Sequence, residues 1–235
     1  MLLNVIYMHH SGVLVETKNY CLIFDYYIEN GQGYILDIEK YKNKKIFVFV
    51  SHFHSEHFDK AIFNWNNLNL DIKYILSDDI KLKDKNDNIF MVHFWKKYKF
   101  DDIDIITLHS NDSGVAFLVK VENNIIYHSG DLNWWNWNGE SEQFNKSMEG
   151  MYKKELETLK NEKIDVAFIP LDPRLEENYI LGMDYFIRNV DVKKVFPIHF
   201  WNNFNIYDTM LADKRSKDYR NKVIKISKKG QVFNI

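Results

Sequence analysis

The segment Lys45–Val50 constrains the fold of this chain more than any other. Its sequence, Lys-Ile-Phe-Val-Phe-Val, is an almost unbroken run of β-branched and aromatic residues, and Ser51-His-Phe-His follows it directly. A strand with apolar residues on both faces must be covered on both sides, as the interior strands of layered α/β proteins are. The pattern therefore predicts an interior strand whose carboxyl end carries histidines.

Other short apolar segments predict a protein built mainly from strands. The chain contains only 9 Gly and 3 Pro, so no Gly/Pro-rich linker separates domains. We expect a single α/β domain over residues 1–235, a four-layer αββα sandwich of two β-sheets with helices outside them. The predicted helices are 60–66, 141–161 and 182–189, and the predicted strands are 4–8, 12–16, 20–25, 45–50, 71–76, 88–93, 103–108, 115–121, 124–129, 166–170, 194–197, 222–226 and 231–235, with a hairpin turn at Asn123-Asn124 and the last two strands paired around Gly230.

Composition narrows the class of partner. The chain has 31 basic and 33 acidic residues, a net charge of −2, which disfavours nucleic acid as a partner. No run approaches the roughly 18 apolar residues that cross a bilayer, and the amino terminus lacks the features of a secretory signal. The one cysteine, Cys21, makes no internal disulfide and is predicted to be a buried strand residue. We therefore expect a cytoplasmic protein that acts on a small molecule and contacts no membrane; its oligomeric state is left open.

The strongest chemical signal is the segment that follows the apolar strand, where three imidazoles and a carboxylate fall within six residues: His52, His54, Glu56 and His57. In an extended segment His52 and His54 project to the same side, so both can bind one cation. Glu56 and His57 can serve that ion or a neighbouring one. The alternative is a cluster of hydrogen-bonded or exposed histidines.

Two later strands also end in metal-ligand residues. The strand at 124–129 is followed by Gly130-Asp131, and the strand at 194–197 is followed by His199. Each signal is weak alone, because Gly-Asp is a common turn and a lone histidine is more often structural. Together they are informative, since α/β proteins gather their sites at one edge of a sheet.

These residues resemble the motifs of the metallo-β-lactamase-fold hydrolase superfamily. The His-x-His-x-Asp-His signature corresponds to residues 52–57, the later Gly-Asp to Gly130-Asp131, and the late strand-end histidine to His199. The chain more closely resembles a bacterial branch of metal-dependent hydrolases related to ascorbate-phosphate lactonase-like and ribonuclease-Z-like proteins. Segments 9–12, 112–117, 128–137, 170–177 and 196–201 carry this closer likeness, which extends over essentially the whole chain.

The resemblance implies a hydrolase in which a metal-bound hydroxide attacks an ester, lactone or phosphodiester bond of a small molecule. It implies one or two Zn²⁺ ions, with Mn²⁺ or Fe²⁺ as alternatives. The implied first metal site comprises His52, His54 and either His109 or Asp112, and the implied second site comprises Glu56, His57 and His199. Asp131 bridges the two metals, and His10 lies near the site. The candidate catalytic residues are Glu56, Asp131 and His10.

Glu56 departs from the family pattern, which has aspartate at this position. Because the glutamate side chain is one methylene group longer, two roles of Glu56 are open. It either binds the second metal with altered geometry, or acts as a base too far from the metal to bind it. A non-catalytic metal- or ligand-binding protein of the same fold is therefore an alternative function. An RNA-processing nuclease is another, and a redox di-iron site, which would need a flavin partner, is a weaker one.

Several further residues are expected to support the site. Asp25 is a candidate hydrogen-bond acceptor for a ligand histidine, and His128 is a candidate for orienting a ligand. Asp172 and Arg174 either form a salt bridge that supports their loop or leave Arg174 to bind an anionic group. Four tryptophans near the proposed ligands are expected either to form an apolar wall of the pocket or to pack in the core: Trp134, Trp135, Trp137 and Trp201.

Overall fold

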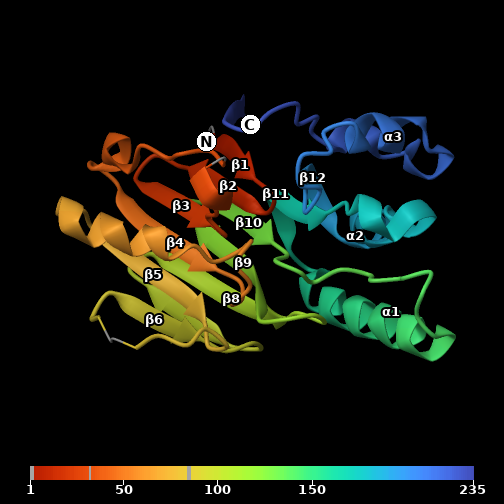
Figure 1. Cartoon of the computed structure of the whole chain (residues 1–235), viewed down its shortest axis with the longest axis horizontal. Helices are drawn as coiled ribbons and strands as arrows, with labels where there is room; N and C mark the ends of the chain where they lie inside the picture. The colour runs from red at the N-terminus through yellow and green to blue at the C-terminus, as the bar shows by residue number, and fades with distance from the viewer. Residues whose placement is uncertain (1–2, 32, 84–85) are drawn as a thin grey trace. The chain divides into compact units, whose positions relative to one another are not determined.

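The computed structural model describes residues 3–31, 33–83 and 86–235. The chain divides into two compact units, which we call the first unit (Met1–His93 with Lys228–Ile235) and the second unit (Phe94–Ser227). Figure 1 traces the chain through both. Each unit contains one mixed β-sheet accompanied by helices, so the predicted pair of sheets is confirmed. The single domain over residues 1–235 stays a prediction.

The first unit is built on a seven-stranded sheet with the strand order β13-β1-β2-β3-β4-β5-β6. Neighbours from β13 to β3 pair antiparallel, and neighbours from β3 to β6 pair parallel. Its strands are β1 (Asn4–His9), β2 (Gly12–Glu16), β3 (Tyr20–Phe24), β4 (Lys45–Val50), β5 (Ile72–Ser77), β6 (Ile89–Val92) and β13 (Gln231–Asn234), and its 3-10 helices are η1 (Glu29–Gly31), η2 (Ile38–Tyr41) and η3 (Lys60–Leu68).

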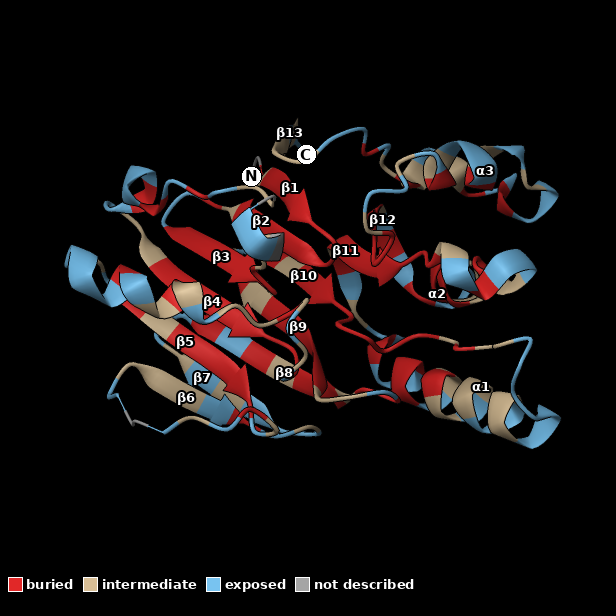
Figure 2. Ribbon diagram, viewed as in Figure 1, coloured by how far each residue is buried: buried red, intermediate tan, exposed pale blue. Residues whose placement is uncertain are grey.

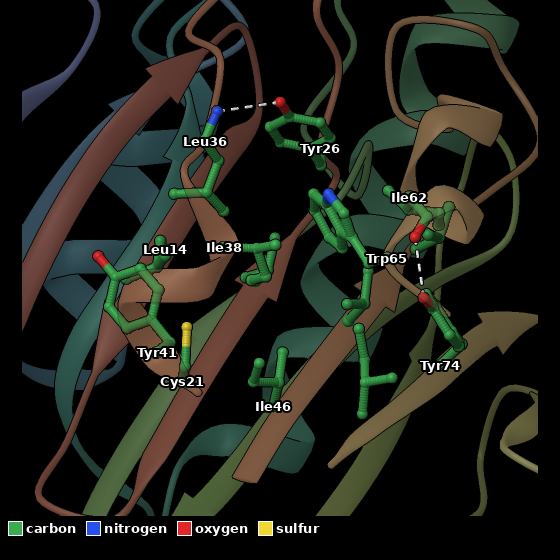
Figure 3. Packing of buried hydrophobic residues seen from close by; sticks show 14 of the residues in the cluster. Leu14, Cys21, Tyr26, Leu36, Ile38, Tyr41, Ile46, Ile62, Trp65 and Tyr74 are labelled. Atoms are coloured by element: carbon green, nitrogen blue, oxygen red, sulfur yellow. Dashed lines mark hydrogen bonds between the residues drawn. The ribbon is translucent and has the colours of Figure 1, made fainter. Parts of the chain in front are cut away.

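One face of this sheet packs against the two longer 3-10 helices (Figure 3). Alternate residues of each strand point to this face, because side chains in a strand alternate with period two. The cluster includes Cys21, Ile46 and Tyr74 from the strands, with Ile38 and Trp65 from η2 and η3. In β4 the residues that point to the opposite face, Phe47 and Phe49, are also fully buried, so the predicted interior strand is confirmed. The predicted burial of Cys21 is confirmed as well.

The second unit is built on a six-stranded sheet with the strand order β12-β11-β10-β9-β8-β7. The three strands from β10 to β12 are parallel, as crossover helices require, and α2 packs against β11 and β12. Its strands are β7 (Lys97–Phe100), β8 (Ile103–His109), β9 (Val115–Val121), β10 (Asn124–His128), β11 (Lys163–Pro170) and β12 (Asp191–Ile198), and its helices are α1 (Glu142–Leu156), η4 (Glu157–Leu159), η5 (Pro173–Asn178), α2 (Leu181–Asn189), α3 (Ile206–Ala212), η6 (Lys214–Ser216) and η7 (Arg220–Lys222).

The edge strands β6, in the first unit, and β7, in the second unit, are less buried than the central strands of the first sheet. Figure 2 shows β3, β4 and β5 almost wholly buried, whereas β6 and β7 are partly exposed. The edge strand β7 alternates lysine with aromatic residues, and it is absent from the prediction because four residues carry little pattern. Across the described ranges, no helix combines the length and apolarity needed to cross a bilayer.

The prediction of a terminal strand pair is wrong. Residues 222–226 form no strand, and Val223 makes only an isolated bridge to Val195. The last strand, β13, pairs with β1 at the other end of the chain. The hairpin turn between β9 and β10 is centred one residue earlier than predicted, because Glu122 and Asn123 carry the positive φ angles of 48° and 63°. The predicted helix 60–66 is the 3-10 helix η3.

Replacing Gly182 with alanine is expected to destabilise the protein by about 1–3 kcal/mol. A Cβ atom there would lie 1.8 Å from Oδ1 of Asn133 and 3.2 Å from the backbone nitrogen of Trp134. Asn133 is 1% exposed, so its side chain has little space to move. Gly150, in α1, provides the control, because nothing lies within 4 Å of its added Cβ and alanine there should stabilise by about 0.5–1 kcal/mol. Urea unfolding of both variants measures the difference, and stabilisation by both would contradict the packing argument.

Candidate functional site

In the first unit, the candidate histidines are organised around the buried carboxylate of Asp25, which directly follows β3. Oδ1 accepts a hydrogen bond from the backbone N–H of Ser51 at 2.7 Å, and Oδ2 accepts one from the Ser51 hydroxyl at 2.7 Å. Nδ1 of His57 lies 2.8 Å from the same Oδ2. Asp25 therefore accepts a hydrogen bond from one of the candidate ligand histidines, and the binding of a metal by His57 stays a prediction.

These hydrogen bonds fix which ring nitrogens of the histidines are available to a metal. A carboxylate can only accept, so His57 donates through Nδ1 and would bind a metal through Nε2. The Ser51 hydroxyl gives its one proton to Asp25, so His52 donates through Nδ1 to Ser51 Oγ, at 3.0 Å. His52 therefore also presents Nε2, which lies 3.0 Å from Nδ1 of His54. Two nitrogens bound to one tetrahedral zinc lie about 3.3 Å apart, so this pair is spaced for a shared ion.

His10 lies with this group, whereas Glu56 is turned to a different partner. The rings of His10 and His57 are 5.3 Å apart, and a ligand nitrogen of each lies within 4.8 Å of the other. The carboxylate of Glu56 is half-exposed and accepts a hydrogen bond from the Ser55 hydroxyl at 3.1 Å. Partial burial acts to raise the pKa of Glu56, but its own backbone N–H and His57 outweigh this and lower the pKa. Its role as ligand or base stays a prediction.

In the second unit, Asp131 and His199 meet directly. Nε2 of His199 lies 3.2 Å from Oδ1 of Asp131, and Nδ1 of His199 lies 2.9 Å from Oδ2 of Asp172. All three side chains are buried. Asp172 is held in turn by the guanidinium of Arg174, with two hydrogen bonds of 3.0 Å from Nε and one of 2.5 Å from Nη2. The predicted salt bridge is confirmed, and its carboxylate orients His199 as Asp25 orients His57.

The two carboxylates also set the charge of His199. Burial alone would lower the pKa of His199, but Asp131 and Asp172 outweigh it and raise the pKa to about 9. For Asp172, burial acts to raise the pKa, while His199 and Arg174 together lower it. The two carboxylates therefore favour the protonated form of His199.

The metal-free protein is expected to lose stability as the pH rises from about 6.5 to about 9. The pKa of His199 is higher in the folded chain, about 9, than the ordinary value of 6.5. Its contribution is therefore complete below pH 6.5 and is lost as the pH passes through 9, a change of up to about 3 kcal/mol. Urea unfolding of chelator-treated protein at several pH values measures this, and His199→Gln should flatten the profile. An unchanged profile in that variant would refute the assignment.

His109 has different neighbours from the other candidates in the second unit. Its ring packs 4.1 Å from the ring of Phe94 and 5.5 Å from that of Trp95. The buried carboxylate of Glu155, on α1, accepts hydrogen bonds from the His109 backbone N–H at 3.0 Å and from Nε1 of Trp95 at 3.0 Å. Asp112, the alternative candidate, bonds to Ser110 Oγ through its backbone nitrogen at 3.3 Å. The assignment of either residue as a ligand stays a prediction.

Two residues near Asp131 take up supporting positions. Nδ1 of His128 accepts a hydrogen bond from the backbone N–H of Gly130 at 3.1 Å, which fixes the turn that carries Asp131. Nε1 of Trp135 donates to the backbone oxygen of Asp131 at 2.9 Å, and its ring meets that of His199 edge-on at 5.5 Å. This geometry is compatible with the predicted role of His128 in orienting a ligand and with that of Trp135 in an aromatic wall of the pocket.

Two residues that hydrogen-bond to candidate ligand histidines, Ser51 and Asp172, were not predicted to do so from the sequence. Both residues lie just beyond the carboxyl end of a strand, Ser51 after β4 and Asp172 after β11. The strand-end argument that selected Asp131 and His199 would have included them. Ser51 lies next to His52 and six residues from His57, whereas Asp172 and His199 are 27 residues apart, so the Asp172–His199 pairing left no local signal.

Comparison with known proteins identifies the fold. No protein-family profile matches the chain. Igni18, a metallo hydrolase from the archaeon Ignicoccus hospitalis, is similar in structure with a TM-score of 0.69 and 17% identity, over 100% of this chain and 99% of that one. YhfI, a metallo-β-lactamase fold protein from Bacillus subtilis, is similar with a TM-score of 0.60 and 12% identity, over 99% of each chain.

CmlA, a diiron β-hydroxylase from Streptomyces venezuelae, matches 100% of this chain with 53% of its own length, at a TM-score of 0.64 and 10% identity. Identities this low establish a shared fold and leave the activity open. The closer resemblance to one branch of hydrolases stays a prediction. The chain has the metallo-β-lactamase fold that its histidine and aspartate motifs predicted.

Proposed function

We propose that this protein is a metal-dependent hydrolase that cleaves an ester, lactone or phosphodiester bond in a small molecule. The proposed metal ligands are those that the family resemblance implied: His52, His54, His57, Asp131 and His199. Glu56 and His109 are proposed as further ligands, and His10 as a residue near the reacting groups. Zn²⁺ is the proposed ion.

One observation carries this proposal: a buried carboxylate holds Nδ1 of a candidate histidine in each unit. Asp25 holds His57 at 2.8 Å, and Asp172 holds His199 at 2.9 Å. Metal-binding histidines nearly always donate their other ring nitrogen to such a partner, which fixes the ring and makes the ligand nitrogen more basic. Burying charged carboxylates beside histidines is costly for stability alone, so the arrangement supports a functional role.

The residues fit a divalent cation by their chemistry. Imidazole nitrogens and carboxylate oxygens are the ligands that zinc takes in hydrolases. A bound cation of this kind supplies a Lewis acid and lowers the pKa of water to about 7. Around it, Asp25 and Asp172 orient the histidines, and Trp135 restricts water beside His199. No serine or cysteine nucleophile is required by this scheme.

The test is elemental analysis of untagged protein purified without chelator, combined with a hydrolase screen. We expect one or two equivalents of zinc, manganese or iron per chain, and hydrolysis of a lactone, ester or phosphodiester that chelator abolishes and added metal restores. Metal binding without turnover of any substrate would favour the non-catalytic alternative. Absence of metal even after reconstitution with zinc and manganese would overturn the proposal.

A further inference from the structure

The ends of β8 and β10 carry two of the proposed metal ligands of the second unit. His109 ends β8, and Asp131 lies three residues beyond the end of β10. Both strands pair antiparallel with β9, which lies between them, so their carboxyl ends are at the same edge of the sheet (Figure 1). Two strand spacings, roughly 10 Å, separate these ends. Strand pairing alone therefore does not bring the loop after β8 into contact with the loop after β10.

Asn111 makes this contact with its side-chain amide. It lies two residues after His109 and is 7% exposed. Its Oδ1 accepts a hydrogen bond from the backbone N–H of Asn133 at 3.2 Å, and its Nδ2 donates to the backbone oxygen of Asn133 at 2.8 Å. Asn133 in turn lies two residues after Asp131. One buried side chain thus joins the two loops through both backbone groups of a single residue.

The same amide connects the loop after β8 to α1. Nδ2 of Asn111 also donates to the backbone oxygen of Met148, at 3.2 Å. About two turns further along α1, the carboxylate of Glu155 accepts a hydrogen bond from the backbone N–H of His109 at 3.0 Å. The helix therefore holds this loop at two points, and through Asn111 it also supports the loop that carries Asp131.

The three bonds of Asn111 require an amide on a short side chain. An amide has two protons to donate and one oxygen to accept, and all of them are used here. An ionised aspartate donates no proton, a serine donates one, and a glutamine is longer by a methylene group. Because the position is buried, a side chain without these groups would leave the backbone of Asn133 without hydrogen-bond partners at this point.

Hydrogen bonds within the Asp131 loop define the shape of its turn. The backbone N–H of Gly130 donates to Nδ1 of His128 at 3.1 Å, and that of Leu132 donates to the backbone oxygen of Ser129 at 2.9 Å. These bonds join residues of the same turn, so they do not set its position relative to the end of β8. The bonds of Asn111 do, because they connect different loops.

We propose that Asn111 is a positioning residue, which holds Asp131 at the distance from the end of β8 that metal binding requires. Its hydrogen bonds go to backbone groups, so it acts on Asp131 through the backbone of Asn133. The inference rests on the proposed function, because it concerns the metal site proposed above. It gives Asn111 an effect on the bound metal that a buried amide needed only for folding does not have.

The test compares Asn111→Leu with Asn124→Leu in the full chain. Asn124 is 6% exposed, and its Nδ2 also donates to two backbone oxygens, those of Val121 and Glu122, at 3.1 to 3.4 Å. It begins β10, at the opposite end of the strand from Asp131. Leucine resembles asparagine in shape and adds no charge, so each variant removes a buried amide of the same unit.

Zinc affinity, measured by competition with a fluorescent chelator, is the first readout. We expect Asn111→Leu to lower it about tenfold, the lower end of the range for residues that orient a metal ligand, and Asn124→Leu to leave it unchanged. The visible absorption of bound Co²⁺, which depends on coordination geometry, is the second readout and should change only in Asn111→Leu. Urea unfolding shows whether both variants fold, and alanine at each position replaces leucine if they do not.

Two results would overturn the inference. One is an equal loss of zinc affinity in the two variants, which would indicate a role in folding alone. The other is a folded Asn111 variant with the zinc affinity and the Co²⁺ spectrum of the wild type. Both leave the proposed function intact. Absence of zinc binding by the wild type would instead overturn the proposed function, and the role of Asn111 with it.

Discussion

Replacing Asp25 with alanine is expected to destabilise the protein by about 3–5 kcal/mol, the largest effect of any single substitution in the site. Asp25 is fully buried and accepts hydrogen bonds from the backbone and hydroxyl of Ser51 and from Nδ1 of His57. Alanine would leave these three donors buried without an acceptor, and each such donor costs about 1–3 kcal/mol. Asp25 also has a φ angle of 45°, a conformation that aspartate tolerates better than alanine.

Asp25→Asn separates stability from metal binding. Asparagine keeps the shape of the side chain and one acceptor oxygen, so the variant should fold. Its amide nitrogen replaces the second oxygen, so the side chain no longer accepts hydrogen bonds from Ser51 and His57 at the same time. Loss of this kind of partner lowers metal affinity about 10- to 100-fold. Competition with a fluorescent zinc chelator measures the affinity, and urea unfolding measures the stability.

The chain offers a matched control in Asp78. It pairs with Nδ1 of His93 at 2.7 Å, nearly the same distance as in the Asp25–His57 pair. The Asp78–His93 side chains are 47% exposed, whereas those of Asp25 and His57 are 0% exposed. Asp78→Asn should therefore change both quantities little, because exposed ion pairs contribute about 0–1 kcal/mol. Equal zinc affinity in the two asparagine variants would refute the role of Asp25.

Replacing His57 or His199 with alanine is expected to lower metal content and to reduce hydrolysis by more than about 100-fold. Removing a metal ligand should lower activity more than removing the carboxylate that orients it, and loss of such a carboxylate alone lowers metal affinity or activity about 10- to 100-fold. Mass-spectrometric metal counting and the rate on the substrate found by screening are the measurements. His93→Ala is the histidine-matched control and should retain both metal and rate, since its ring is exposed.

Comparing the two variants tests whether both histidines belong to the proposed ligand set. If both His57 and His199 bind metal for one reaction, each variant should lose hydrolysis even where it keeps part of the metal. A His199→Ala variant that folds, loses no metal and retains full activity would remove His199 from the set. Unfolding curves for each variant separate loss of a ligand from loss of the fold.

Local sequence pattern predicted most of the strands because its physical cause is local. Val115–Val121, Lys45–Val50 and Gly12–Glu16 are observed with the bounds that their apolar and β-branched residues indicated. Side chains alternate in a strand, and a run that is apolar on both faces has to be buried on both. The positions of the histidines and of Asp131 at strand ends follow from the same reading.

Pairings between distant residues left no such pattern. β13 pairs with β1, more than 220 residues earlier, rather than with its sequence neighbour 222–226. Glu155 was expected on the helix 141–161, but nothing local shows that its carboxylate binds Trp95 and His109, which lie 60 and 46 residues away. Such contacts are selected by packing over the whole unit, because a buried polar group must find a partner wherever one lies.

The sequence by itself determined most of the strands, although it missed β7 and wrongly predicted a strand at 222–226, and it identified the candidate metal ligands and Asp25 as a candidate acceptor for a histidine. Only the tertiary structure decided that the carboxylate of Asp25 accepts a hydrogen bond from His57 and that of Asp172 accepts one from His199. It also decided that the carboxylate of Glu56 accepts a hydrogen bond from Ser55. The physical reason is one of range. Strand propensity and side-chain chemistry act within a few residues, whereas the partner of a buried hydrogen-bonding group is fixed by three-dimensional proximity.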